Sequence, residues 1–211
     1  MGRPEADVDL KDATTFWAMG HLGNGLIAAK RFEEALSVQE AKLSTMRRLG
    51  IPEQLILDDQ SNLATTYQYL GRAEQALRLR HDVYSGHLKF DGEESHETLT
   101  AANNYAVTLA CHDRFEEAKL LYRKSIPVAQ RVLGKCHDLT LRLRSTYAIA
   151  LRDDLAATLD DLREAVTTLE DTERIARRVL GSVHPLAVEV ERDLGKARVA
   201  LRAREMSPGS A

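Results

Sequence analysis

The chain contains 211 residues, of which 44% are hydrophobic and 29% are charged, and its formal net charge is −3. This balance does not favour a nucleic-acid surface, and no apolar run approaches the roughly 18 residues that a membrane-spanning helix needs. The two cysteines, Cys111 and Cys136, do not form a disulfide framework, and the polar, acidic first ten residues lack the apolar segment of a secretory signal. We therefore expect a cytoplasmic protein without nucleic-acid or membrane partners.

Apolar residues recur every three or four positions, which predicts amphipathic α-helices and an all-α fold. We expect a flexible N-terminal arm over residues 1–11, a single repeat domain over 12–205 and a flexible tail over 206–211. Within the domain, the expected units and the terminal helix cover about 12–50, 51–92, 93–134, 135–181 and 185–205. In the first three units, helices are expected over about 12–29 (or 14–29), 32–49, 53–70, 72–89, 95–111 and 114–133.

A fixed spacing links the units. In each unit a small residue on the first helix precedes an alanine on the second by 12 residues, or by 17 in the last unit; the pairs are Gly23 and Ala35, Ala64 and Ala76, Ala106 and Ala118, and Ala148 and Ala165. The next small residue follows 14 residues after a closing glycine at Gly50, Gly92, Gly134 and Gly181. A period of about 42 residues predicts a stacked solenoid of helical hairpins, with an irregular helical bundle as the alternative.

The fourth unit departs from this spacing by five residues, which lie within residues 152–161. Either its first helix runs for an extra turn or its hairpin loop is longer. The extra turn is favoured, because residues 154–159 are good helix formers without glycine or proline. Leu194 and Gly195 fall on the spacing as a fifth first helix, which begins near Pro185 and is expected to cap the last repeat.

In each first helix, the small residue follows a leucine or a tyrosine, and these dipeptides carry a family resemblance. They are Leu22-Gly23, Leu63-Ala64, Tyr105-Ala106, Tyr147-Ala148 and Leu194-Gly195. The pattern Leu-Gly-x-x-His occurs over residues 133–137 and 180–184, and Arg-Phe-Glu-Glu-Ala occurs over residues 114–118. Together with Asn103-Asn104, these motifs resemble the tetratricopeptide repeat, in the longer form found in kinesin light chains. The resemblance covers roughly residues 14–204.

The resemblance implies a right-handed α-α superhelix of four helical hairpins plus a C-terminal capping helix, with the first helices lining a concave groove. It implies that this groove binds a peptide segment or a partner domain. The positions that map to the groove are Trp17, His21, Asn24, Asp58, Asn62, Thr65, Tyr69, Thr100, Asn103, Asn104, Val107, Arg142, Ser145, Ile149 and Arg152.

Asn62 and Asn104 occupy equivalent positions one unit apart. An asparagine amide both donates to and accepts from a peptide backbone, so such a series suits an extended segment. The alternative is that these asparagines cap local backbone or face water. The carboxylate clamp of the family does not fit, because its cationic positions hold Gly20 and Tyr69, and binding of chaperone tails is not expected.

Chemistry-bearing motifs are scarce. The tripeptide Cys-His-Asp occurs at residues 111–113 and 136–138, but the two copies fall at the end and at the start of a first helix and cannot form equivalent sites. His137 and His184 share a connection position, where we expect them to cap helix starts. No metal-ligand pair, phosphate-binding glycine loop or nucleophile–base pair is present, so we expect no catalytic residue, no metal and no cofactor.

The sequence therefore predicts a non-enzymatic scaffold or adaptor that binds a protein or peptide partner. A structural subunit that self-associates through repeat edges is the alternative. Whether the protein is a monomer or a homodimer stays open at this point.

Overall fold

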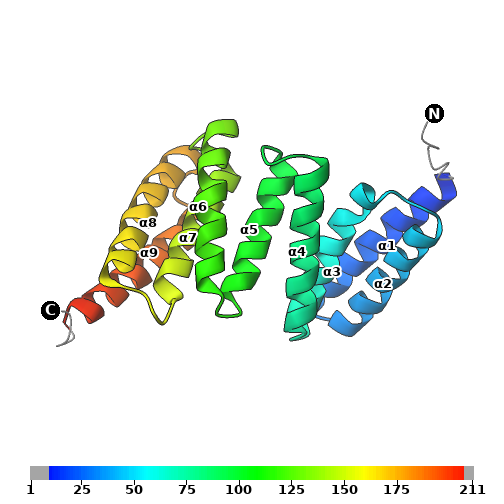
Figure 1. The fold of residues 1–211 in the computed structure, drawn as a ribbon, viewed down its shortest axis with the longest axis horizontal. Helices are drawn as coiled ribbons and strands as arrows, with labels where there is room; N and C mark the ends of the chain where they lie inside the picture. The colour runs from blue at the N-terminus through cyan, green and yellow to red at the C-terminus, as the bar shows by residue number, and fades with distance from the viewer. Residues whose placement is uncertain (1–9, 207–211) are drawn as a thin grey trace. The chain divides into compact units, whose positions relative to one another are not determined.

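The computed structural model describes residues 10–206, and these residues form helices and no strand (Figure 1). In chain order the elements are α1 (Leu10–Ala28), α2 (Phe32–Arg48), the short 3-10 helix η1 (Glu53–Ile56), α3 (Leu57–Tyr69), α4 (Ala73–Phe90), α5 (His96–Ala110), α6 (Phe115–Val132), α7 (Asp138–Asp153), α8 (Leu159–Leu180) and α9 (Pro185–Glu205). Below, α1, α3, α5 and α7 are called first helices, and α2, α4, α6 and α8 second helices. Apart from residues 10, 11 and 206, the predicted arm and tail lie outside the described residues.

The chain folds into two compact units that meet at the Gly92–Glu93 bond. The first unit contains α1 to α4, and the second contains α5 to α9. The dividing point coincides with the predicted boundary between the second and third repeats. Each unit is described by itself.

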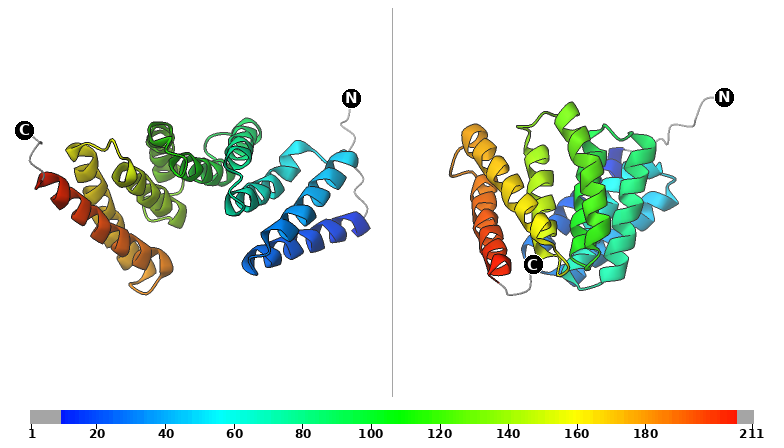
Figure 2. Two further views of the ribbon diagram at one scale, coloured as in Figure 1. Left: turned by 90° about the horizontal axis from the view of Figure 1, so that it is seen from below. Right: turned by 60° about the vertical axis from the view of Figure 1, so that its left-hand side comes forward.

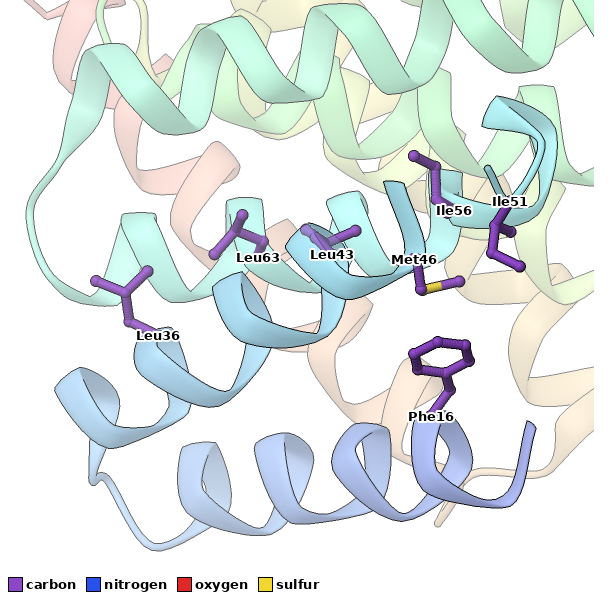
Figure 3. Close-up of a cluster of buried hydrophobic side chains, with 7 residues drawn as sticks. All are labelled: Phe16, Leu36, Leu43, Met46, Ile51, Ile56 and Leu63. Atoms are coloured by element: carbon purple, nitrogen blue, oxygen red, sulfur yellow. The ribbon is translucent and has the colours of Figure 1, made fainter. Parts of the chain in front are cut away.

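In the first unit, α1 packs on α2, α3 packs on α4, and α2 packs on α3. A cluster of apolar side chains from α1, α2, η1, α3 and the connection before η1 lies between these elements. It consists of Phe16, Leu36, Leu43, Met46, Ile51, Ile56 and Leu63 (Figure 3). Each fully buried side chain of this size contributes about 1.5–3 kcal/mol. The amphipathic pattern of the sequence therefore specifies this core directly.

In the second unit, α5 packs on α6 and α7 on α8, while α9 lies along α8 and also contacts α7 (Figure 2). The predicted small residues lie at the contacts between paired helices. Ala106, Ala118, Ala148 and Ala165 have no exposed surface, and neither do their counterparts Ala35, Ala64 and Ala76. The predicted spacing of the hairpins is thus confirmed in the structure.

Side-chain caps start several helices where the sequence predicts them. The Oγ of Ser95 accepts a hydrogen bond of 3.0 Å from the backbone N–H of Thr98. The Nδ1 atoms of His137 and His184 accept from the backbone N–H groups two residues further on, at 3.2 and 3.3 Å. These bonds satisfy N–H groups that a helix leaves free in its first turn, so the predicted capping role of both histidines is confirmed.

The expected extra turn of the fourth unit's first helix is wrong, because α7 ends at Asp153 and the hairpin loop is longer instead. The carboxylate of Asp154 accepts a hydrogen bond of 2.6 Å from the Nζ of Lys119 and one of 2.8 Å from the backbone N–H of Ala156. Thr158 and Asp161 then form a capping box that begins α8. These polar contacts outweigh the helix propensity of residues 154–159.

Lys119 is a buried lysine with two acidic partners, since Glu116 also accepts from its Nζ at 2.8 Å. Burial opposes its charge, but the hydrogen bonds with Asp154 and Glu116 outweigh this effect and raise the pKa of Lys119. The same contact helps to lower the pKa of Asp154 against the opposing effect of burial. Because removal of either partner would leave a buried charge uncompensated, this pair holds the end of α7 in place.

The turns between first and second helices use the left-handed backbone region in the first three hairpins. Lys30 and Asp113 have φ values of 59°, and Gly71 at the equivalent turn has a φ of 69°. Glycine adopts this conformation without the steric cost that a Cβ atom brings.

We expect Gly71→Ala to lower the free energy of unfolding by about 1 kcal/mol, because an alanine is strained at positive φ. The matched control is Gly25→Ala inside α1, where a Cβ would meet no atom within 4 Å. There the higher helix propensity of alanine should raise stability by about 0.5–1 kcal/mol. Urea unfolding of both variants checks the opposite signs, and equal signs would contradict the turn assignment.

Candidate functional site

All fifteen candidate residues lie on first helices. In the first unit, α1 carries Trp17, His21 and Asn24, and α3 carries Asp58, Asn62, Thr65 and Tyr69. In the second unit, α5 carries Thr100, Asn103, Asn104 and Val107, and α7 carries Arg142, Ser145, Ile149 and Arg152.

On α1, Trp17 and His21 form an exposed aromatic pair one helical turn apart. Their ring centroids lie 4.1 Å apart with the ring planes at 61°, and Trp17 is 67% exposed. Asn24 is also exposed, and its amide makes no hydrogen bond within the described part of the chain. This helix therefore presents an apolar ring and a free amide on its surface.

On α3, Asn62 is exposed and its amide has no hydrogen-bond partner among residues 10–206. Asp58, one turn earlier, is exposed as well. By contrast, the ring of Tyr69 stacks on Phe32 at 4.7 Å, with 11° between the ring planes. Asn62 thus presents a free amide on this part of the helix, while Tyr69 also helps to join α2 to α3.

Thr65 is held by a residue that the sequence did not single out, the buried Arg80 of α4. Arg80 donates to the Oγ of Ser61 at 2.6 Å and to the Oγ1 of Thr65 at 2.7 Å, and its Nε has no partner. Among the described residues no carboxylate forms an ion pair with it, and burial lowers its pKa to about 10. The guanidinium therefore stays charged at neutral pH, and it orients two hydroxyls on the candidate face.

A comparison of equivalent positions in the second helices could have identified Arg80 from the sequence. It lies four residues after Ala76, where the other second helices carry the uncharged residues Gln39, Tyr122 and Leu169. A charged residue at a position that is otherwise uncharged and inward-facing is a signal of a specific polar contact.

Lys42 places a cation beside Gly20, one of the two positions where the carboxylate clamp of the family requires a cation. Its Nζ lies 3.2 Å from the position that a Cβ on Gly20 would occupy. Asp59 accepts a hydrogen bond of 2.5 Å from this ammonium group, so the charge is already compensated. The structure therefore offers no free cation at this position of the clamp.

On α5, two adjacent asparagines differ in their surroundings. The Oδ1 of Asn103 accepts a hydrogen bond of 2.9 Å from the Oγ1 of Thr146 on α7, whereas the amide of Asn104 has no partner within the described residues. Val107 is partly exposed, and the hydroxyl of Thr100 is buried without a hydrogen bond. Asn103 joins two first helices, and Asn104 is the free amide.

On α7, both candidate arginines are engaged by acidic groups. Arg142 donates to Asp138 at 2.7 Å, and Arg152 donates to Asp153 at 2.7 Å and to Asp193 of α9 at 3.4 Å. Burial lowers the pKa of Arg152, but its contacts with Asp153 and Asp193 outweigh this effect and leave the pKa raised.

The two remaining candidates on α7 are less accessible than a surface ligand site requires. Ser145 is 5% exposed, and Ile149 is only partly exposed. The hydroxyl of Ser145 is therefore not on an open surface, and Ile149 has no polar atom to offer.

The cysteine motifs lie apart, as the sequence predicts. Cys111 follows the end of α5, and Cys136 precedes the start of α7. Burial, together with the charge of Asp153, raises the pKa of the Cys111 thiol, so the nucleophilic thiolate is disfavoured. Residues 10–206 contain no group of three or more His, Cys, Asp or Glu side chains placed to hold a metal ion, and none of their helices is long and apolar enough to cross a membrane.

Residues 55–131 match the sequence model of the Tetratricopeptide repeat family. The matched segment, which runs from η1 into α6, carries the tetratricopeptide-repeat pattern. None of the curated protein sequences compared with the chain matches it.

Solved structures of tetratricopeptide-like repeats share the fold. Two crystal structures of nearly identical TPR-like repeats, from a protein assigned as a kinesin light chain of Podosopora anserina, give TM-scores of 0.76 and 0.75 at 20% and 21% identity. Each covers 90% of this chain, which in turn covers 88% and 89% of those chains. BtubC (BKLC) from P. vanneervenii gives a TM-score of 0.60 at 16% identity, with 90% of this chain and 80% of that chain covered.

The predicted all-α tetratricopeptide-type solenoid of the kinesin light chain-like kind is therefore confirmed. Tetratricopeptide repeats generally serve as protein–protein interaction modules, and the fold is typically that of a non-enzymatic scaffold.

We expect Asn103→Ala to lower the free energy of unfolding by about 0.5–1 kcal/mol. It removes the acceptor on α5 for the Thr146 hydroxyl, which then bonds only to carbonyl groups of its own helix, such as that of Arg142 at 2.8 Å. Asn104→Ala is the neighbouring control and should change stability by less than about 0.5 kcal/mol. Thermal unfolding of the two variants separates the roles, and a larger loss for Asn104→Ala would show that Asn104 is the structural residue.

Proposed function

We propose that the first helices of each unit bind an extended stretch of a partner protein. The amides of Asn24 and Asn62 would contact its backbone in the first unit, and the amide of Asn104 would do so in the second. The fold supports the general role, because such repeats are protein–protein interaction modules. The proposal adds the location and the chemistry of the contact.

One observation carries the proposal: among the described residues the amides of Asn62 and Asn104 have no hydrogen-bond partner, whereas Thr65 and Asn103 near them are engaged. Asn103 shows what a structural asparagine looks like in this protein, since its Oδ1 accepts from Thr146. A free side-chain amide offers both a donor and an acceptor, which matches the alternating N–H and C=O groups of an extended backbone.

Hydrogen bonds among other polar residues hold this surface of the first helices in place. Arg80 fixes the hydroxyls of Ser61 and Thr65, and Asn103 links α5 to α7. A face whose other side chains are already held loses less conformational entropy on binding than a mobile one. The exposed Trp17 and His21 add an apolar contact beside Asn24.

The test compares a double variant, Asn62→Ala with Asn104→Ala, with the wild-type protein. Each lost hydrogen bond is worth about 0.5–1.5 kcal/mol, so partner affinity should fall roughly tenfold or more while the unfolding midpoint stays nearly constant. Affinity is measured by titration calorimetry with a partner segment obtained by pull-down.

The matched control removes two amides from second helices, as Gln75→Ala with Gln130→Ala. We expect this variant to bind like the wild type. Equal loss of affinity in both double variants would place the contact elsewhere. An equal loss of stability in the asparagine variant would show that its amides are structural.

Self-association through repeat edges is the competing function. Light scattering over a range of protein concentrations distinguishes it from partner binding. A monomer that binds the segment supports the present proposal, and a dimer that binds none contradicts it.

A further inference from the structure

Arg80 of α4 is a buried cation without an acidic partner. Its side chain is 6% exposed, and no carboxylate among residues 10–206 forms an ion pair with it. The two buried lysines of the described chain are compensated, since Lys42 donates to Asp59 and Lys119 donates to Asp154. A buried charge is costly unless an opposite charge compensates it. Arg80 is therefore the exception that needs an explanation.

The guanidinium of Arg80 uses only part of its hydrogen-bonding capacity, because a guanidinium has five N–H donors. Its Nη1 donates to the Oγ of Ser61 at 2.6 Å. Its Nη2 donates to the Oγ1 of Thr65 at 2.7 Å and to the Oε1 of Gln68 at 3.4 Å. The Nε–H has no partner, and neither has the second N–H of Nη1 within the described residues. Two donors of a buried cation are thus unpaired.

The side chains that cover this guanidinium are open to solvent in part. Ser61, Thr65 and Gln68 lie on one side of α3, and all three are partly exposed. Thr65 donates its own proton to the backbone carbonyl of Ser61 at 3.2 Å, whereas the hydroxyl proton of Ser61 has no acceptor among residues 10–206. Because the Oγ of Ser61 and the Nη1 of Arg80 are 2.6 Å apart, two unused donors lie next to each other at this surface.

We propose that Arg80 and Ser61 bind a phosphoryl group, either free phosphate or the phosphorylated side chain of a partner protein. One phosphoryl oxygen accepts from the hydroxyl of Ser61, and another accepts from the spare N–H of Nη1. The negative charge of the group compensates the buried guanidinium. Arginine suits this role because its N–H groups form strong, directional hydrogen bonds with phosphate oxygens.

The acidic residues at the start of α3 do not take the place of this ligand. Asp59 accepts from the Nζ of Lys42 at 2.5 Å, and Asp58 lies 3.9 Å from the Nε2 of His87. Neither carboxylate forms an ion pair with Arg80. The charge of the guanidinium therefore stays available for an external anion.

The hairpin fold does not require a cation at this position. At the equivalent positions of α2, α6 and α8 the chain has Gln39, Tyr122 and Leu169. The Oε1 of Gln39 accepts from the hydroxyl of Thr66 at 2.7 Å. Arg80→Gln thus introduces a residue that another hairpin already accommodates, and it removes a buried charge. In phosphate-free buffer, the unfolding midpoint of this variant should equal or exceed that of the wild type.

Titration calorimetry of the full chain with sodium phosphate tests the site, with sodium chloride at equal ionic strength as the reference. We expect the wild type to bind phosphate and Arg80→Gln to bind it at least roughly tenfold more weakly, because a charge-assisted hydrogen bond is lost. Ser61→Ala should weaken binding by roughly three- to tenfold. Arg78→Gln replaces an exposed arginine on the same helix and is the matched control, which should bind like the wild type.

Two further ligands distinguish the sources of the group. A glycine pentapeptide with a central phosphoserine that binds as tightly as phosphate would show that the site accepts the group on a partner protein. Binding of phosphate alone would assign the site to the free anion. Sodium acetate should bind more weakly than phosphate, and equal affinity for acetate would overturn the phosphoryl assignment.

Absence of phosphate binding to the wild type would overturn the proposal, and so would equal binding by Arg80→Gln. If Arg80→Gln is unstable, Ser61→Ala decides the question, because unchanged phosphate affinity in that variant contradicts the site. The variant Asn62→Ala with Asn104→Ala should bind phosphate like the wild type. This proposal and the first-helix proposal can therefore fail independently.

Discussion

The close approach of two helices at a small residue is the constraint on which the structure depends. Each hairpin buries a small residue on each of its two helices, such as Gly23 and Ala35 or Ala106 and Ala118, and none of these alanines has exposed surface. At Gly23 an added Cβ would already come within 3.3 Å of the Cγ of Gln39. Because this contact recurs in every hairpin, the apolar stripes before and after it fall into register, and a core forms from short segments that could not bury both faces alone.

The same register explains which polar groups are held and which are free. Lys119 and Asp154 fix the end of α7, and Arg80 fixes two hydroxyls of α3. Asn62 and Asn104 lie on the first-helix surface beyond these contacts and keep their amides unpaired within the described residues. The division between structural and free polar groups is therefore set by how the hairpins pack, and it does not follow from residue type.

The period of about 42 residues was sufficient to predict the hairpins, the helix-capping histidines and the terminal helix, because small residues and apolar stripes act locally. The longer loop after α7 could not be predicted from propensity, since a partner 35 positions earlier in the chain, Lys119, holds Asp154. Residue type likewise could not separate Asn103 from Asn104, which differ only in what lies across from them. Lys119 and Arg80 were detectable in principle, as charged residues in stretches where the other second helices are apolar or uncharged.

The buried alanines of the second helices set the distance between paired helices, and two substitutions on one helix test this most directly. Ala35 on α2 has no exposed surface, whereas Ala41 on the same helix is exposed. Measured by urea unfolding, Ala35→Leu should lower the free energy of unfolding by about 1–3 kcal/mol through overpacking, and Ala41→Leu should change it by less than about 0.5 kcal/mol. Equal effects of the two substitutions would show that the helices of this hairpin do not meet at Ala35, and would contradict the account.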